Sequence, residues 1–144
     1  MMGGQSGKVA VVTGSNTGIG YYMARALASK GASVIMACRD PTKGEVARDR
    51  ILEEFPGSEV SVSVLDLADL SSIEEFADGF PSEGGLDILI NNAGVMIPPK
   101  SRTKDGFELQ FGTNHLGHFA LTGRLLPILE RTDGSRVVTV SSIA

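Results

Sequence analysis

The stretch Thr13-Gly14-Ser15-Asn16-Thr17-Gly18-Ile19-Gly20 directly follows the apolar run Lys8-Val9-Ala10-Val11-Val12 and precedes a segment with helical periodicity. A parallel strand that enters a helix through glycines lets the backbone approach a pyrophosphate, whose charge the helix N-terminus stabilises. The competing interpretation, a tight turn that binds nothing, is disfavoured by the strand before it and the helix after it. The expected phosphate-binding residues are Gly14, Ser15, Asn16, Thr17, Gly18, Ile19 and Gly20.

Apolar runs of strand length alternate with helix-period segments along the chain, which is typical of βαβ units and a parallel sheet. The expected strands are 8–12, 33–37, 60–65, 86–90 and 136–140, and the expected helices are 20–30, 41–55, 71–79 and 105–130. Ser71 and Ser72 are expected to cap the third helix. Since no repeat or linker interrupts the pattern, residues 1–144 are expected to form a single domain.

Composition restricts the class of partner. The 42% of hydrophobic residues is enough for a globular core and argues against disorder. A net charge of −4, without a run of Lys or Arg, disfavours nucleic acid and anionic membranes and leaves a small molecule as the expected partner. Cys38 is the only cysteine, so no internal disulfide can form. With no export signal and no long apolar run, a cytoplasmic location is expected.

The glycine spacing departs from G-x-G-x-x-G, because Met23 stands where that pattern has its third glycine. It matches T-G-x-x-x-G-x-G, and the chain resembles the short-chain dehydrogenase/reductase family along its whole length. The further matching motifs are Asp66, Asn91-Asn92-Ala93-Gly94, Asn114 and Ser141-Ser142. The resemblance implies a three-layer α/β fold of Rossmann type with strand order 3-2-1-4-5, in which the family's last strands and helices are missing.

The end of the second strand predicts the dinucleotide. In this fold that position meets the adenosine ribose, where a carboxylate selects NAD and an arginine accommodates the 2′-phosphate of NADP. Cys38 stands where NAD-dependent members of the family usually carry Asp, and Arg39 follows it. A guanidinium matches a phosphate in charge and in donor geometry, so NADP(H) is the expected cofactor. The alternative is that Arg39 is a solvated surface residue, for example one paired with Asp40.

Two further segments are expected to contact the cofactor. By resemblance, Asp66 contacts the adenine edge beside Leu67, although a turn or helix-cap role for this acid is an equal alternative. Two amides, a small residue and a glycine at a strand's carboxyl end suit close approach of a nucleotide. The residues expected to line the site are Asn92, Ala93 and Gly94.

The resemblance implies hydride transfer between the nicotinamide and a carbonyl or alcohol carbon. In the family a Tyr and a Lys handle the proton, a Ser holds the substrate oxygen and an Asn organises a proton path. Asn114 and Ser142 match the last two roles. Alternation along the last strand is expected to put Val138, Val140 and Ser142 on one face and Ser141 on the other.

The family's Tyr-x-x-x-Lys pair has no match in this sequence, whose two tyrosines, Tyr21 and Tyr22, follow the glycine-rich loop. The chain is therefore expected to be a fragment of an oxidoreductase, inactive on its own. The alternative is a noncatalytic NADP-binding or interaction module. No metal site is expected, because no carboxylate or thiol joins His115 and His118.

The stretch Thr103–Phe119 closely resembles the retinol-dehydrogenase-like branch of the family, whose members act on hydrophobic alcohols, aldehydes or ketones. The resemblance therefore implies a small hydrophobic carbonyl or alcohol substrate. It also implies that the helix containing Asn114 can mediate pairing into a homo-oligomer.

Overall fold

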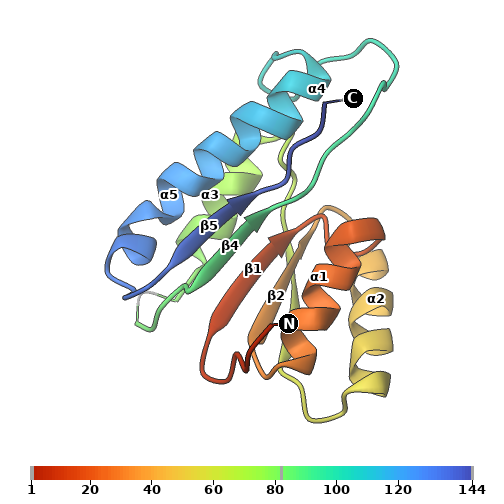
Figure 1. Ribbon diagram of the computed structural model, residues 1–144. Helices are drawn as coiled ribbons and strands as arrows, with labels where there is room; N and C mark the ends of the chain where they lie inside the picture. The colour runs from red at the N-terminus through yellow and green to blue at the C-terminus, as the bar shows by residue number, and fades with distance from the viewer. Residues whose placement is uncertain (1, 82, 144) are drawn as a thin grey trace.

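Across residues 2–81 and 83–143, which the computed structural model describes, five parallel strands form one sheet in the order β3-β2-β1-β4-β5 (Figure 1). The expected Rossmann-like strand order is therefore confirmed. The strands are β1 (Val9–Thr13), β2 (Ser33–Cys38), β3 (Val60–Val64), β4 (Ile88–Asn91) and β5 (Arg136–Thr139).

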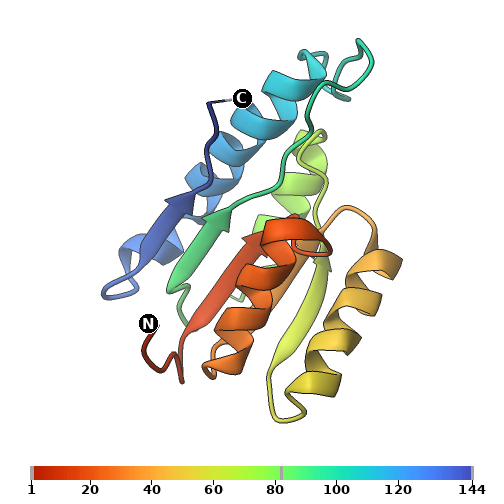
Figure 2. The ribbon, with the colours of Figure 1, turned by 45° about the vertical axis from the view of Figure 1, so that its right-hand side comes forward.

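Helices cover both faces of the sheet (Figure 2). They are α1 (Gly18–Ser29), α2 (Pro41–Glu54), α3 (Leu70–Asp78), α4 (Leu109–Phe111), the π-helical turn η1 (Gly112–Gly117) and α5 (His118–Glu130). Helices α1 and α2 pack on one face, where they share a core with Val12 and Met36. Helices α3 and α5 pack on the other, where they share a core with Val11 and Leu89.

Helix α3 begins earlier than expected, and Asp69 rather than Ser71 or Ser72 caps it. The Asp69 carboxylate accepts the N–H of Ser71 at 2.9 Å, as an N-cap acid does. The hydroxyl of Ser72 is used differently, since it accepts the N–H of Asp66 at 2.9 Å. Both serines therefore lie inside the helix.

The helix expected over 105–130 begins at Leu109 and contains the π-helical turn. The Glu108 carboxylate accepts the N–H groups of Gln110 and Phe111 at 3.0 and 2.7 Å, and it fixes the helix start. The preceding residues instead form a tight turn, in which the N–H of Thr103 donates to the carbonyl of Phe107 at 2.8 Å. Within residues 2–81 and 83–143, no helix is long and apolar enough to cross a membrane.

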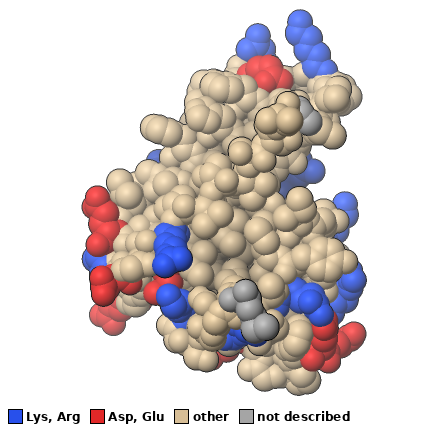
Figure 3. All heavy atoms as spheres, viewed as in Figure 1, with Lys and Arg blue, Asp and Glu red and all other residues tan. Residues whose placement is uncertain are grey.

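Strand β5 lies at the edge of the sheet and is exposed along its length. It ends at Thr139, short of the expected boundary at residue 140. Val137 and Val138, which lie on opposite faces, are 43% and 45% exposed, so neither helical layer covers this strand. Figure 3 shows the whole molecule from the same side as Figure 1, and most of the surface in this view consists of uncharged residues.

Candidate functional site

A cleft of ≈ 690 Å³ opens at the carboxyl ends of the strands, where β1 and β4 run side by side. The strand order reverses direction at this point, and ligands of open parallel sheets bind there. Five segments that are separate in sequence line the cleft. Its lining includes nine of the predicted site residues, Gly14, Asn16, Thr17, Arg39, Asp66, Leu67, Asn92, Ala93 and Gly94.

Helix α1 differs from its neighbours in how it begins. Its N-cap residue, Thr17, makes no side-chain hydrogen bond to the first turn, and that turn carries no acidic residue. Asp40 and Asp69 cap α2 and α3 with their carboxylates. The first-turn N–H groups of α1 therefore have no side-chain cap, and a phosphate suits such a helix terminus.

The glycines of the loop serve close approach. Gly14 has φ +61°, and a β-carbon there would lie 2.8 Å from the Cα atom of Ala93. A β-carbon on Gly20 would collide with the Asn92 side chain and the Gly14 carbonyl. Gly18, at φ +57°, would meet no atom within 4 Å. Gly14 and Gly20 therefore allow protein packing, whereas Gly18 leaves the backbone open to a ligand.

Ser15, Gly18, Ile19 and Gly20, also predicted to contact phosphate, are absent from the cleft lining. Ser15 is fully buried, and its Oγ lies 3.6 Å from the Sγ of Cys38. This contact joins the loop to the end of β2, and burial raises the pKa of the Cys38 thiol. The Ile19 side chain is 67% exposed. Phosphate binding by the backbone N–H groups of this loop stays a prediction.

Arg39 follows β2, lines the cleft and is exposed. In the described part of the chain its guanidinium makes no hydrogen bond or ion pair, so it is a solvated side chain that does not pair with Asp40. Asp40 instead accepts the backbone N–H of Lys43 at 3.2 Å and pairs with the Lys43 ammonium at 4.0 Å. Lys43 also lines the cleft, which places a second cation near Arg39. Sequence reasoning missed Lys43, although its position in the first turn of α2 was available as a signal.

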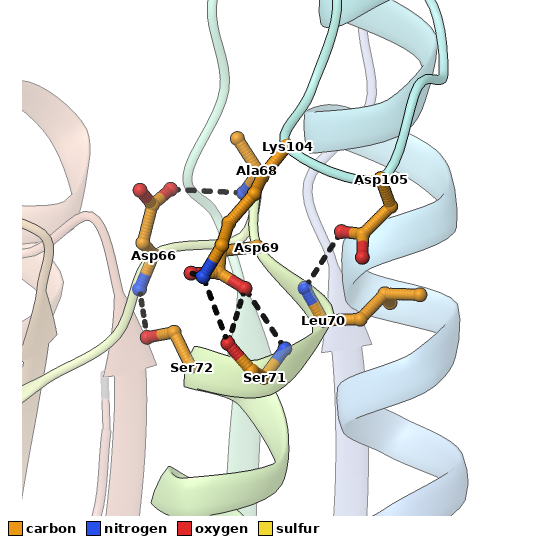
Figure 4. Close-up of polar contacts among 8 residues, drawn as sticks. All are labelled: Asp66, Ala68, Asp69, Leu70, Ser71, Ser72, Lys104 and Asp105. Atoms are coloured by element: carbon orange, nitrogen blue, oxygen red, sulfur yellow. Dashed lines mark hydrogen bonds and ion pairs between the residues drawn. The ribbon is translucent and has the colours of Figure 1, made fainter.

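Residues 65–68, which follow β3, form another wall of the cleft, and polar contacts hold this segment in place (Figure 4). Asp66 accepts the N–H of Ala68 at 2.9 Å, so it is a turn acid that also lines the cleft. Lys104 donates its N–H to the Ala68 carbonyl at 3.0 Å and its ammonium to Asp69 at 2.7 Å. These bonds tie the segment before α4 to the loop after β3. Leu67 is buried in this wall, at 6% exposed.

Asn114 lies in the π-helical turn, and its side-chain oxygen and nitrogen both bond to the backbone of Val95. Its Oδ1 accepts the N–H of Val95 at 2.8 Å, and its Nδ2 donates to the Val95 carbonyl at 2.8 Å. The asparagine therefore holds the backbone that follows Gly94. Ser142 lies beyond the end of β5 and is exposed.

Both histidines have structural contacts. His118 is buried, and its Nε2 lies 2.8 Å from the Thr13 hydroxyl. Burial lowers the pKa of its imidazole. The exposed His115 ring stacks on Phe111 with centroids 5.2 Å apart. Among the described residues, no group of three potential protein ligands could hold a metal ion.

The family described as short chain dehydrogenase matches residues 8–144. The chain belongs to this family. Human retinol dehydrogenase 12 is 56% identical over 139 residues, which cover 96% of this chain and 44% of that protein. Zebrafish (Danio rerio) polyprenol dehydrogenase is 46% identical over 143 residues, again 96% of this chain and 44% of that protein. This chain thus spans less than half the length of these family members.

Solved structures of the family have the same fold. A protein of Mycobacterium paratuberculosis superposes with a TM-score of 0.86 at 53% identity, over 98% of this chain and 48% of that one. A metagenomic short-chain oxidoreductase in complex with NADP gives a TM-score of 0.83 at 30% identity, over 96% of this chain and 64% of that one. The family's Rossmann-like architecture therefore extends over almost all of this chain.

The contact between Lys104 and Asp69 predicts a measurable titration. Hydrogen bonds from Lys104 and Ser71 lower the pKa of the Asp69 carboxyl to about 2. Its stabilising contribution is therefore present above the usual pKa of 3.8 and is lost as the pH falls to about 2. We expect Lys104→Met to raise the pKa of Asp69, measured by NMR titration of carboxyl carbons. The pKa of Glu108, which backbone N–H groups lower, is the control and should not change.

An Asp69 carboxyl that titrates at the same pH in wild type and Lys104→Met would contradict this assignment. The Ser71 bonds remain in the variant, so only part of the shift should disappear.

Proposed function

We propose that the cleft binds NADP(H) and that the whole protein is an NADP(H)-dependent oxidoreductase that interconverts a hydrophobic alcohol and its aldehyde or ketone. The observation that carries this proposal is the glycine-framed N-terminus of α1, which lacks a side-chain cap beside the cleft. Among the structural relatives, a metagenomic short-chain oxidoreductase and a Shigella flexneri dehydrogenase were both solved with NADP.

The residues present fit this cofactor. Thr113 lines the cleft with a buried hydroxyl that has no hydrogen-bond partner in the described part of the chain. Arg39 and Lys43 supply positive charge at one end of the cleft, as a 2′-phosphate requires. Backbone N–H groups at Gly18 to Gly20 would hold the pyrophosphate. Asn92 to Gly94 would then line the nicotinamide end, which lies across the switch point from Arg39.

The chemistry supplied by the bound cofactor is the transfer of a hydride to or from the substrate carbon. Asn114 holds Val95 through two hydrogen bonds, and it orders the backbone at the nicotinamide end. Ser142 follows β5 at the carboxyl edge of the sheet, and its hydroxyl would donate to the substrate oxygen. A donor fixed at that oxygen stabilises the negative charge that develops there during reduction.

The substrate class is inferred from relatives and from local apolar surface. Relatives bear the names retinol dehydrogenase and polyprenol dehydrogenase, both of which denote apolar alcohols. Beyond Val95, the side chains of Met96 and Ile97 are 74% and 84% exposed. Ile97 has φ 48°, a strained conformation for a β-branched residue, and its N–H donates to Gln110 at 3.0 Å. This fixed apolar segment suits contact with a hydrophobic substrate.

A noncatalytic binding module is the second candidate for the 144-residue chain itself. The two tyrosines both lie on α1, where the Tyr21 ring packs under the guanidinium of Arg50 at 4.8 Å. Neither tyrosine therefore belongs to the segments around Asn114 and Ser142. We propose that this chain alone binds the nucleotide without turnover, and that catalysis requires a general acid from elsewhere in the protein.

The cytoplasmic location and the homo-oligomeric state remain predictions.

The assignment of Arg39 predicts nucleotide preference. A charged hydrogen bond contributes about 1.5–3 kcal/mol, so Arg39→Ser should weaken NADPH binding about tenfold to a hundredfold and leave NADH affinity unchanged. The measurement is a fluorescence titration of the 144-residue chain with each nucleotide. Arg48→Ser removes the same charge from an arginine paired with Asp49 on α2, and it serves as the control. Equal affinity of the wild type for NADPH and NADH would overturn the assignment.

The two serines after β5 allow a matched test of activity in the full-length protein. Ser142→Ala should lower kcat for NADPH-dependent reduction of an apolar aldehyde by about 10²–10³, because it removes a donor to the developing charge. Ser141→Ala should change kcat by less than about twofold, since its side chain is not assigned to the substrate. The opposite ranking of the two variants would assign the role to Ser141.

A further inference from the structure

His118 occupies a buried position between the glycine-rich loop and the π-helical turn. It is 6% exposed and begins α5. Its Nε2 lies 2.8 Å from the Oγ1 of Thr13, the last residue of β1. Its Nδ1 lies 2.9 Å from the backbone carbonyl of Asn114. One side chain thus bridges two segments that border the cleft.

The hydrogen-bond donors fix the state of this imidazole. The Asn114 carbonyl can only accept, so Nδ1 carries a proton. The Thr13 hydroxyl already accepts the N–H groups of Asn92 and Ala93, each at 2.9 Å. A hydroxyl has two acceptor positions, so it donates its own proton, and Nε2 at 2.8 Å is a closer acceptor than the Ile90 carbonyl at 3.4 Å. The ring is therefore neutral, with its proton on Nδ1.

This network reaches the backbone that follows β4 in two ways. Through Thr13, the imidazole orients the hydroxyl that holds the N–H groups of Asn92 and Ala93. The imidazole also bonds to the backbone carbonyl of Asn114, and the side chain of Asn114 in turn bonds to the N–H and the carbonyl of Val95. The buried groups satisfy one another, and loss of one partner leaves the others unpaired.

We propose that His118 is a positioning residue, which holds the segment Asn92–Val95 against the end of β1 and so shapes the nicotinamide end of the cleft. The ligand part of this inference rests on the proposed binding of NADP(H). Arg39 and Asp66 follow β2 and β3 and take no part in the bonds of His118. The adenosine end of the cleft should therefore be insensitive to this imidazole.

The first test measures the backbone directly and needs no ligand. In the 144-residue chain, His118→Phe keeps a ring of similar shape and removes both hydrogen bonds. We expect backbone hydrogen exchange of Asn92, Ala93 and Val95 to accelerate about tenfold or more, while exchange in β2 and β3 stays unchanged. His115→Phe alters an exposed histidine of the same segment, and it should leave all of these rates unchanged.

Two conservative variants separate the two contacts. His118→Asn places a donor near the position of Nδ1, and it should restore slow exchange at Val95 only. His118→Gln places an acceptor near the position of Nε2, and it should restore slow exchange at Asn92 and Ala93 only. In wild type, ¹⁵N NMR of the ring should show protonated Nδ1 and unprotonated Nε2.

The second test separates the two ends of the cleft. His118→Phe should weaken NADPH binding about tenfold and leave the affinity for adenosine 2′,5′-bisphosphate, which lacks the nicotinamide, within about twofold. Unchanged exchange at Asn92, Ala93 and Val95, or acceleration spread equally over β2 and β3, would overturn the role of His118. If wild type binds neither ligand, the proposed NADP(H) site is wrong, and the exchange data alone decide the positioning role.

Discussion

The contact between the loop after β1 and the backbone after β4 sets the geometry on which the cleft depends. The side-chain amide of Asn92 donates from Nδ2 to the backbone carbonyls of Thr13 and Gly14, at 3.0 and 3.3 Å. A β-carbon on Gly14 would approach the Ala93 Cα within 2.8 Å, so only glycine permits this spacing. The two halves of the sheet are thereby joined at the point where the strand order reverses.

From this junction the cleft gains two chemically distinct ends. Arg39 after β2 and Lys43 in the first turn of α2 bring positive charge to one end; both residues are exposed, and the Lys43 ammonium pairs with Asp40 at 4.0 Å. The other end consists of backbone held by partly buried hydrogen bonds to the side chains of Thr13 and Asn114. In the proposed function, the charged end sets the affinity for the nucleotide and the choice between NADP(H) and NAD(H). The end formed by Asn92–Val95 orients the nicotinamide.

The sheet and the outline of the cleft could be predicted from the sequence, because their signals are local. Apolar runs such as Val9–Thr13 mark buried parallel strands, and the glycine loop marks the ligand edge. The Asp69 cap, the π-helical turn and the bond between Thr13 and His118 could not be predicted. The last of these joins residues 105 positions apart, and no periodicity records such a contact. The first turn of α2, which contains Lys43, could be predicted from the sequence, but its position beside the cleft depends on the fold.

The central claim is that the uncapped N-terminus of α1 is a nucleotide site. A crystal structure of the chain with NADP⁺ tests it most directly. The account predicts the pyrophosphate against the backbone N–H groups of Gly18 to Gly20 and the 2′-phosphate against Arg39. A nucleotide bound elsewhere, or in the cleft with its pyrophosphate away from α1, would contradict the account.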